Sequence, residues 1–316
     1  VTGALLIIGT ILVVNREITL GQFVAAEVVI ILVLTAVEKM IMHTEVVYDM
    51  LTAVDKVAHL TDLPLERSGG LDFPQHAGAS GYSIELNNLT YKFKDSETPI
   101  LKNINLRIDK KERVCISGTP GSGKSLLAHI ISGLYTDYSG GISVNGYSLR
   151  DIDLTHLRDK VSKNISNEDI FDGTLYDNIL LGKSIRPEEA IEALKKVGLH
   201  EYVSALPEGL QTKLISGGKG LSNSTIHKLV LARCLAKKPE LLILNDFFSG
   251  LSKADKIELV QCAIDPNETW TLVAVSNDPL VMAASDRVII LDKGEVIDSG
   301  SYEALYKKGV IQKYIE

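Results

Sequence analysis

The chain has 316 residues, which is a length of about two domains. Its formal net charge is −7, and 45% of its residues are hydrophobic. The acidic balance argues against a nucleic-acid-binding surface, so nucleic acid is not expected among the partners. Cys115, Cys234 and Cys262 are widely spaced without a metal-ligand pattern, which is typical of buried thiols in a reducing compartment. The seven histidines form no pair with metal-ligand spacing, so a zinc site is not expected.

The first 60 residues contain two apolar runs. Residues 1–14 are almost wholly apolar, residues 15–22 are a polar interruption, and residues 23–37 are apolar with Glu27 as their only charge. The second run continues into residues 38–60 with helical spacing of its apolar side chains. We predict a transmembrane hairpin whose second helix extends from the bilayer into water. The alternative is a pair of buried helices in a soluble protein.

We do not expect the apolar start of the chain to be a signal peptide, because the sequence has no basic segment there. We expect the chain to be a piece of a longer protein. Neither apolar run alone reaches the roughly 18 apolar residues of an isolated spanning helix. In a hairpin, Glu27 would face the bundle interior or line a pathway, and the interior position is the simpler interpretation.

A linker is predicted at residues 64–82, which are rich in proline and glycine. From residue 83 onward, short apolar runs alternate with helical patterns, which indicates a parallel-centred α/β core. The earliest strands are expected to form a smaller antiparallel layer. Strands are predicted at residues 83–91, 104–108, 114–117, 141–144, 241–244, 271–275 and 288–291, and an amphipathic helix at residues 187–197.

A glycine-rich loop at residues 118–125 matches the P-loop pattern G-x-x-x-x-G-K-[ST] at every fixed position. An apolar strand precedes it, and a helix is expected over residues 126–134. Backbone N–H groups and the positive end of that helix would bind phosphates, Lys124 would reach the outer phosphates, and the Ser125 hydroxyl would hold Mg²⁺. A glycine turn with a chance lysine is the alternative. The predicted nucleotide-binding loop comprises Gly118, Thr119, Pro120, Gly121, Ser122, Gly123, Lys124, Ser125 and Leu126.

Four further stretches accompany the loop. They are FDGTLYDNI at residues 171–179, LPEGLQT at 206–212, LVLARCL at 229–235 and ILDKG at 290–294. In order and spacing, this part of the chain resembles the nucleotide-binding domain of an ABC transporter. The apolar helices before it resemble the end of an exporter-type transmembrane domain, so the resemblance covers nearly all of the chain.

The resemblance implies an α/β fold: a P-loop NTPase core with an antiparallel β subdomain and a helical subdomain, preceded by transmembrane α-helices. Residues 1–63 would end the transmembrane domain, residues 64–82 would be the linker, and residues 83–316 the nucleotide-binding domain. ATP and Mg²⁺ are the implied cofactors. The implied partners are the lipid bilayer, a transported substrate of unknown identity, and a second ABC subunit, identical or different. The implied location is the cytoplasmic membrane, with the nucleotide-binding domain in the cytosol.

Several positions depart from the family's pattern. The adenine-stacking aromatic, usually Tyr, falls at Phe93, with Tyr91 as second choice and a packed core aromatic as the alternative. The glutamine that senses Mg²⁺ falls at Ser166 in an ungapped count, but we favour Asn167, which keeps an amide and would be a metal-side group.

The signature motif LSGGQ is replaced by LSNST at residues 221–225. Ser222 is retained and could bond a phosphate across a dimer, while Asn223 and Ser224 replace the glycines that permit close backbone approach. SGGKG at residues 216–220 resembles the signature, but its distance from residues 229–235 is wrong.

The acidic strand end of the family is also altered. Asn245 falls at the metal-side aspartate, and Asp246 falls at the catalytic glutamate with a carboxylate one methylene shorter. Ser252 falls at the aspartate of the following loop. Asn277 falls at the switch histidine, where it can donate a hydrogen bond but cannot carry a proton. The predicted catalytic residues are therefore Asp246, Lys124 and Asn277, and the metal-side residues are Ser125, Asn167 and Asn245.

These positions predict ATP binding with slow hydrolysis. The leading interpretation is a subunit of an ATP-driven exporter. The main alternative is the degenerate, regulatory half of a heterodimeric transporter, although here the signature and the acidic motif are altered in the same chain. A soluble P-loop switch or DNA-repair ATPase is the third interpretation, and the leading apolar helices argue against it.

Overall fold

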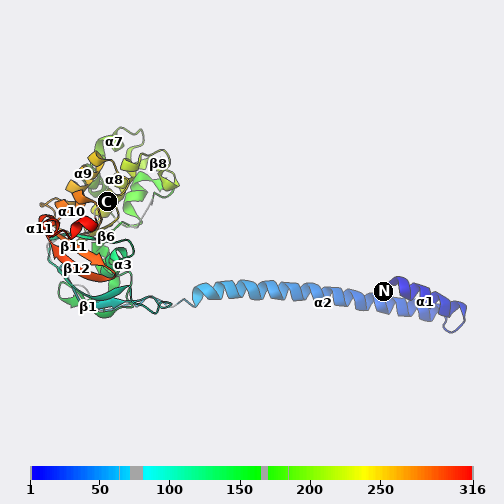
Figure 1. The fold of residues 1–316 in the computed structure, drawn as a ribbon. Coiled ribbons are helices and arrows are strands. Elements are labelled where there is room, and N and C mark those ends of the chain that lie inside the picture. Colours follow the sequence, from blue (N-terminus) through cyan, green and yellow to red (C-terminus); the bar gives the residue numbers. More distant parts are fainter. Residues whose placement is uncertain (1, 64, 72–80, 165–169, 184, 315–316) are drawn as a thin grey trace. The chain divides into compact units, whose positions relative to one another are not determined.

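A computed structural model describes residues 2–63, 65–71, 81–164, 170–183 and 185–314. The chain divides into two compact units, Val1–Arg67 and Ser68–Glu316. The division falls within the residues predicted to be a linker. Figure 1 draws the helices and strands of both units.

The first unit consists of two helices, α1 (Thr2–Val14) and α2 (Leu20–Thr61). Thr19 caps α2, because its hydroxyl accepts a hydrogen bond from the Gln22 N–H at 3.3 Å while the Gln22 side chain accepts one from the Thr19 N–H at 2.9 Å. Gly9 of α1 is buried under the ring of Phe23, and a Cβ there would lie 2.0 Å from Phe23 Cε2. A glycine therefore lets the two helices approach closely.

Helix α2 has the length and composition of a membrane-spanning helix, with a mean hydropathy of 2.3 over its most apolar window and none of that window buried. Its 42 residues extend over about 63 Å at 1.5 Å per residue, against a hydrocarbon thickness of about 30 Å. The helix is thus about twice as long as a single crossing needs. This agrees with the prediction of a second helix that continues into water.

The second unit begins with a four-stranded antiparallel sheet in the order β2-β1-β4-β5. Its strands are β1 (Ile84–Tyr91), β2 (Leu101–Ile108), β4 (Ser139–Val144) and β5 (Tyr147–Ser148). Strand β2 starts three residues earlier than predicted because Leu101 pairs with Tyr91 and is fully buried. The predicted antiparallel layer is confirmed.

A six-stranded sheet forms the core, in the order β12-β11-β3-β10-β9-β6. The pairs from β11 to β6 are parallel, and β12 is antiparallel to β11 at the edge. Strands β3, β9 and β10 are buried at every position, which explains their continuous apolar runs. The bounds are β3 (Arg113–Gly118), β6 (Val161–Lys163), β9 (Leu241–Asn245), β10 (Thr271–Val275), β11 (Arg287–Asp292) and β12 (Glu295–Gly300).

Helices complete the core, and a separate helical part lies between β6 and β9 in the sequence. The core helices are α3 (Lys124–Ile131), α4 (Leu154–Lys160), α9 (Lys253–Ile264), α10 (Pro279–Ala284) and α11 (Tyr302–Lys307). The helical part contains α5 (Leu175–Leu180), α6 (Pro187–Lys196), α7 (His200–Ser204), α8 (Asn223–Ala236) and the small pair β7 (Gly173–Thr174) and β8 (Lys213–Leu214). Within this unit, Figure 1 places β1 at one end and α7 at the other.

Two details differ from the sequence predictions. The helix after the phosphate loop ends at Ile131 rather than residue 134, because Gly133 follows it with a φ of 72°. Cys115 and Cys234 are buried free thiols as predicted, but Cys262 is only partly buried, since it lies near the end of the surface helix α9.

Candidate nucleotide-binding site

Three neighbouring parallel strands end at the same edge of the core sheet. Val275 of β10 pairs with Ile116 of β3 on one side and with Asn245 of β9 on the other. The residues that follow these strands therefore meet at one edge, where ligands bind in open α/β sheets. The edge brings together the loop that starts at Gly118, the Asn245-Asp246 pair and Asn277.

The phosphate loop has a backbone that only glycine permits at its two ends. Gly118 has a φ of 150°, and a Cβ there would lie 1.8 Å from the Leu291 carbonyl oxygen. Gly123 has a φ of 97° and directly precedes α3, where a Cβ would lie 2.7 Å from Leu101 Cδ2. The first turn of α3 thus points its free N–H groups at the loop, as phosphate binding requires.

Side chains hold the loop in this shape. Lys124 Nζ donates to the carbonyl oxygens of Gly118 at 2.7 Å and Thr119 at 2.9 Å, so its ammonium lies across the loop. The Thr119 hydroxyl donates to Asp292 Oδ1 at 2.7 Å, which fixes the loop to β11. Ser122 Oγ is buried without a hydrogen-bond partner, whereas Ser125 is exposed at the start of α3.

Asn277 lies directly against the end of β3. Its Oδ1 accepts hydrogen bonds from the Ser117 hydroxyl at 2.9 Å and from the Gly118 N–H at 3.2 Å. The remaining polar group of Asn277 is its NH₂, which is a donor. With Oδ1 already bonded, the NH₂ is the group of this side chain that can donate to a ligand.

Asn245 carries an unsatisfied acceptor at the same edge. Its backbone is held by Asn164, with Asn245 N–H donating to Asn164 Oδ1 at 2.6 Å and Asn164 Nδ2 donating to the Asn245 carbonyl at 3.0 Å. Asn245 Oδ1 is buried without a hydrogen-bond partner. A buried oxygen without a partner could accept a hydrogen bond from a water bound to Mg²⁺. The Ser122 hydroxyl, which also has no partner, could donate to a phosphate oxygen.

A family model described as "ABC transporter" matches residues 101–249, which include this loop and edge. This part of the chain belongs to the ABC transporter family. The chain is 26% identical over 294 residues to an ATP-dependent lipid A-core flippase of Francisella novicida, covering 92% of this chain and 49% of the relative. It is 30% identical over 227 residues to a putative multidrug export ATP-binding/permease protein of Staphylococcus aureus, covering 71% of this chain and 39% of the relative.

Among solved structures, a bacterial Atm1-family ABC exporter with ATP bound superposes with a TM-score of 0.74 at 21% sequence identity. The match covers 93% of this chain and 52% of the other. The chain spans about half the length of the curated relatives it matches. The predicted fold class is confirmed. The chain is an integral membrane protein with its ABC domain in the cytosol, as the sequence predicts.

Asp246 of the ABC domain follows Asn245 in a left-handed conformation with a φ of 49°. Asp tolerates this region better than most residues. Its N–H donates to the Val275 carbonyl at 3.0 Å, and its side chain is exposed at the edge of the sheet. Asp246 therefore lies beside Asn245 in a fixed backbone geometry. Asn167 and its alternative Ser166 lie outside the described residues.

The aromatic residues near the start of the ABC domain form a cluster. Phe93 is 42% exposed, while Tyr91 is buried at 6%. Their ring centroids are 5.3 Å apart, and Tyr135 lies 6.2 Å from Phe93. Burial lowers the pKa of His129, which lies against Tyr135. Of the two candidates, only Phe93 is exposed enough to stack on a base.

The signature residues are held within their own chain. Ser222 caps α8, because its Oγ accepts from the Thr225 N–H at 3.1 Å. Asn223 Nδ2 donates to the Gly250 carbonyl at 3.1 Å, and Ser224 Oγ donates to Asp255 Oδ1 at 2.6 Å. Among the described residues, no recorded hydrogen bond joins these three to the phosphate loop. The structure therefore gathers the loop, Asn245, Asp246 and Asn277 at one edge, while the signature residues bond to Gly250 and Asp255.

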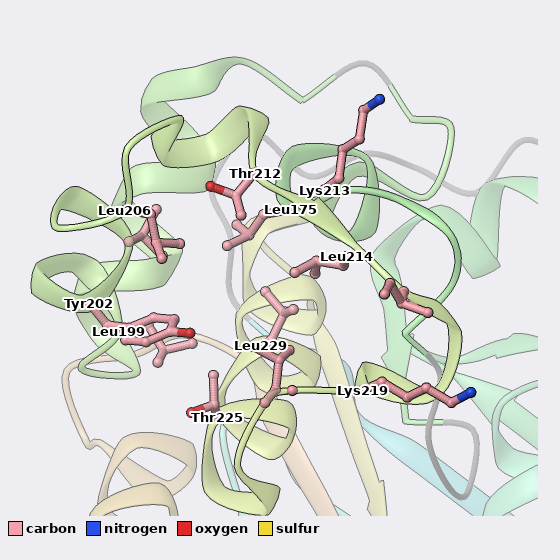
Figure 2. Close-up of a pocket in the computed structure, with 14 residues that line it drawn as sticks. Leu175, Leu199, Tyr202, Leu206, Thr212, Lys213, Leu214, Lys219, Thr225 and Leu229 are labelled. Carbon is pink, nitrogen blue, oxygen red and sulfur yellow. The ribbon is translucent and has the colours of Figure 1, made fainter.

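The helical part of the ABC domain contains an apolar pocket of about 160 Å³ (Figure 2). The Lys213 and Lys219 ammonium groups point away from the leucines in Figure 2. None of the lining residues belongs to the phosphate loop or to the strand edge beside it, although Leu221 and Thr225 are part of the signature motif. The pocket is lined mainly by Leu175, Leu199, Val203, Leu206, Leu214 and Leu229.

A wider pocket of about 570 Å³ adjoins the end of β6, and its lining includes the basic residues Lys163 and Arg233 among apolar and small residues. Burial lowers the pKa of Lys163 to about 8. Arg233 Nε donates to the Asn178 carbonyl at 2.7 Å, so its guanidinium is pinned within the helical part.

Residues that hold the candidate site or the signature in place, and that the sequence reasoning missed, are Ser117, Asn164, Asp255 and Asp292. Ser117, Asn164 and Asp292 act through partners far away in sequence, so no local pattern reveals them. Ser252-x-x-Asp255 is a helix-start pattern that could have been found.

Proposed function

We propose that this chain is the ATP-binding subunit of an ATP-driven ABC exporter in which hydrolysis is slow. The observation that carries the proposal is a complete phosphate loop that opens a helix at Lys124 in a chain led by apolar helices. In this proposal residues 1–63 end the transmembrane domain, residues 64–82 are the linker, and residues 83–316 are the nucleotide-binding domain.

Binding would rest on groups that are all present. Phe93 would stack on the base, and the N–H groups of residues 118–126 other than Pro120 would surround the phosphates. The Lys124 ammonium would move from the loop carbonyls to the outer phosphates. Ser125, Asn167 and Asn245 would hold Mg²⁺, the last through a bound water. Mg-ATP, when bound, supplies a phosphoanhydride bond and the free energy for closing a dimer.

Hydrolysis depends on charge that this chain has partly lost. Asn245 is neutral. Asp246 holds its carboxylate one methylene further from an attacking water than a glutamate does. Asn277 can donate a hydrogen bond but cannot take up a proton as a histidine can. Losing one preorganised contact costs on the order of 10²–10³ in rate, although such losses do not multiply when the groups act together. We therefore infer slow turnover with retained binding.

Closure requires a second ABC subunit, identical or different. Ser222, Asn223 and Ser224 of one chain would face the phosphate loop of the other, so that ATP favours the closed pair and hydrolysis reopens it. Lipid A-core flipping and multidrug export are named for two similar proteins. We infer a transported compound as the third partner, besides the bilayer and the second subunit.

A second candidate function is a regulatory half of a heterodimeric transporter that binds ATP without turning it over. The neutral Asn245 favours it, whereas the altered signature in the same chain complicates it, because both composite sites of a dimer would then be impaired. Co-purification with a second chain that carries intact Asp-Glu and LSGGQ motifs would support this candidate over the first.

The test is ATP binding and turnover by the full-length protein in lipid. We expect binding that Lys124→Ala abolishes, and turnover well below that of exporters with an intact Asp-Glu pair. Turnover as fast as theirs, abolished by Asp246→Asn, would contradict slow hydrolysis. Absence of ATP binding by the folded protein would contradict the proposal as a whole.

A further inference from the structure

The first turn of α8 is joined to the segment after β9 by three different contacts. Asn223 Nδ2 donates to the Gly250 carbonyl at 3.1 Å, and Ser224 Oγ donates to Asp255 Oδ1 at 2.6 Å. One turn further along α8, the His227 ring lies 5.4 Å from the Phe247 ring between centroids. The two segments are therefore linked by amide, hydroxyl and aromatic groups together.

Asp255 is the centre of this link because both of its oxygens are used. Oδ1 accepts from Ser224, and Oδ2 accepts from the Ser252 hydroxyl at 2.6 Å. Two hydrogen bonds hold the pKa of the Asp255 carboxyl below its usual range. The one from Ser224 has the larger effect, and the one from Ser252 adds to it. The carboxylate is thus ionised at neutral pH, and hydrogen bonds to an ionised acceptor are about twice as strong as neutral ones.

An ion pair continues the link along the same two helices. Lys228 of α8 lies 2.7 Å from Glu258 Oε2 of α9, each one turn beyond Ser224 and Asp255. Helix α8 is therefore fastened to α9 over its first two turns, at residues spaced three and four apart on one face of each helix.

The link joins two groups with different predicted roles. Ser222, which caps α8, would face the nucleotide of a partner chain, and Asp246, at the start of the loop that ends at Ser252, would act on the chain's own nucleotide. Asn223 and Ser224 stand where the family has glycines, and glycine has no side chain with which to donate. The altered signature thus supplies the donors that the link needs.

We propose that Asp255 is a positioning residue that holds the signature segment, residues 222–225, and the loop 246–252 as one unit. A displacement at either nucleotide is thereby carried to the other within a single chain. This inference rests on the proposed function for its consequence in catalysis, but the link itself exists without nucleotide.

The test is hydrogen exchange of the full chain in lipid without nucleotide. Asp255→Ala should speed exchange about tenfold or more at both residues 222–226 and residues 246–252, because it removes two charge-assisted hydrogen bonds. Asp153→Ala is the matched control, since Asp153 caps α4 through the Thr155 N–H at 2.7 Å and should leave both segments unchanged. Faster exchange confined to residues 252–256 would mean that Asp255 only caps α9, and would overturn the proposal.

Ser224→Ala keeps the test decisive if Asp255→Ala does not fold, because it leaves the cap on α9 intact. It should still speed exchange at residues 246–252, and unchanged exchange there would overturn the proposal. With Mg-ATP, Asp255→Asn should lower kcat while changing KM less than about threefold, which a loss of overall stability would not do. If the wild type binds no ATP, the proposed function fails while the exchange result still decides the link.

Discussion

At the scale of single residues, Asn245 decides how strongly this site depends on Mg²⁺. Its buried, unpartnered Oδ1 offers a neutral oxygen where a charged one would bind the ion better. Asn245→Asp should therefore increase the gain in ATP affinity that Mg²⁺ provides by about tenfold, a difference of about 1.4 kcal/mol. Titrations with Mg²⁺ and with a chelator measure it.

The control for this prediction is Asn267→Asp, which makes the same charge change in an exposed loop. It should leave the Mg²⁺ dependence as in the wild type. An Asn245→Asp variant whose ATP affinity gains nothing further from Mg²⁺ would show that Asn245 lies away from the metal.

Gly118 and Gly121 of the phosphate loop differ in what a methyl group would meet. At Gly118 it would lie 1.8 Å from the Leu291 carbonyl oxygen, whereas at Gly121 it meets nothing within 4 Å. Gly118→Ala should lower the free energy of unfolding by about 2–4 kcal/mol through overpacking and strain, and Gly121→Ala by about 1–2 kcal/mol through its φ of 76° alone. Thermal unfolding of the two variants compares them, and equal losses would contradict the difference in packing.

At the scale of elements, the helical part depends on leucines that surround the smaller pocket. Leu229 of α8 is 1% exposed, while Ile215 on the pocket's rim is 56% exposed. Leu229→Ala should cost about 2–5 kcal/mol of stability, because it removes buried contacts and enlarges a cavity. Ile215→Ala should cost less than about 1 kcal/mol. Chemical denaturation measures both, and a comparable loss for Ile215→Ala would contradict this account of the pocket.

The elements also show how much of the fold could be predicted from the sequence. The fully buried strands β3, β9 and β10 could be predicted because their apolar runs are continuous, and the phosphate loop could be predicted because its glycines and Lys124 have fixed spacing. Strand β6 has three residues and β12 alternates at an exposed edge, so neither has a distinctive apolar run. Both strands form because they pair with neighbouring strands, β9 for β6 and β11 for β12.

The same reasoning applies to the site. Lys124, Asp246 and Asn277 could be identified from their offsets along the chain. The Asn164 bonds to Asn245 and the Asp255 bond to Ser224 connect residues 81 and 31 positions apart. No local pattern encodes such contacts. The first depends on the pairing of β6 with β9 in the core sheet, and the second depends on how the helical part packs on the core.

At the scale of the whole molecule, apolar helices and an ABC domain occur in one chain, and the proposed coupling of nucleotide to the membrane depends on this arrangement. The most direct measurement is Mg-ATP binding by the full-length protein in lipid, with Lys124→Ala as the matched variant. We predict saturable binding by the wild type and at least about a hundredfold weaker binding by the variant, since charge-assisted contacts to phosphate are lost. Folded wild-type protein that binds no Mg-ATP, or a Lys124→Ala variant that binds it equally well, would contradict the account.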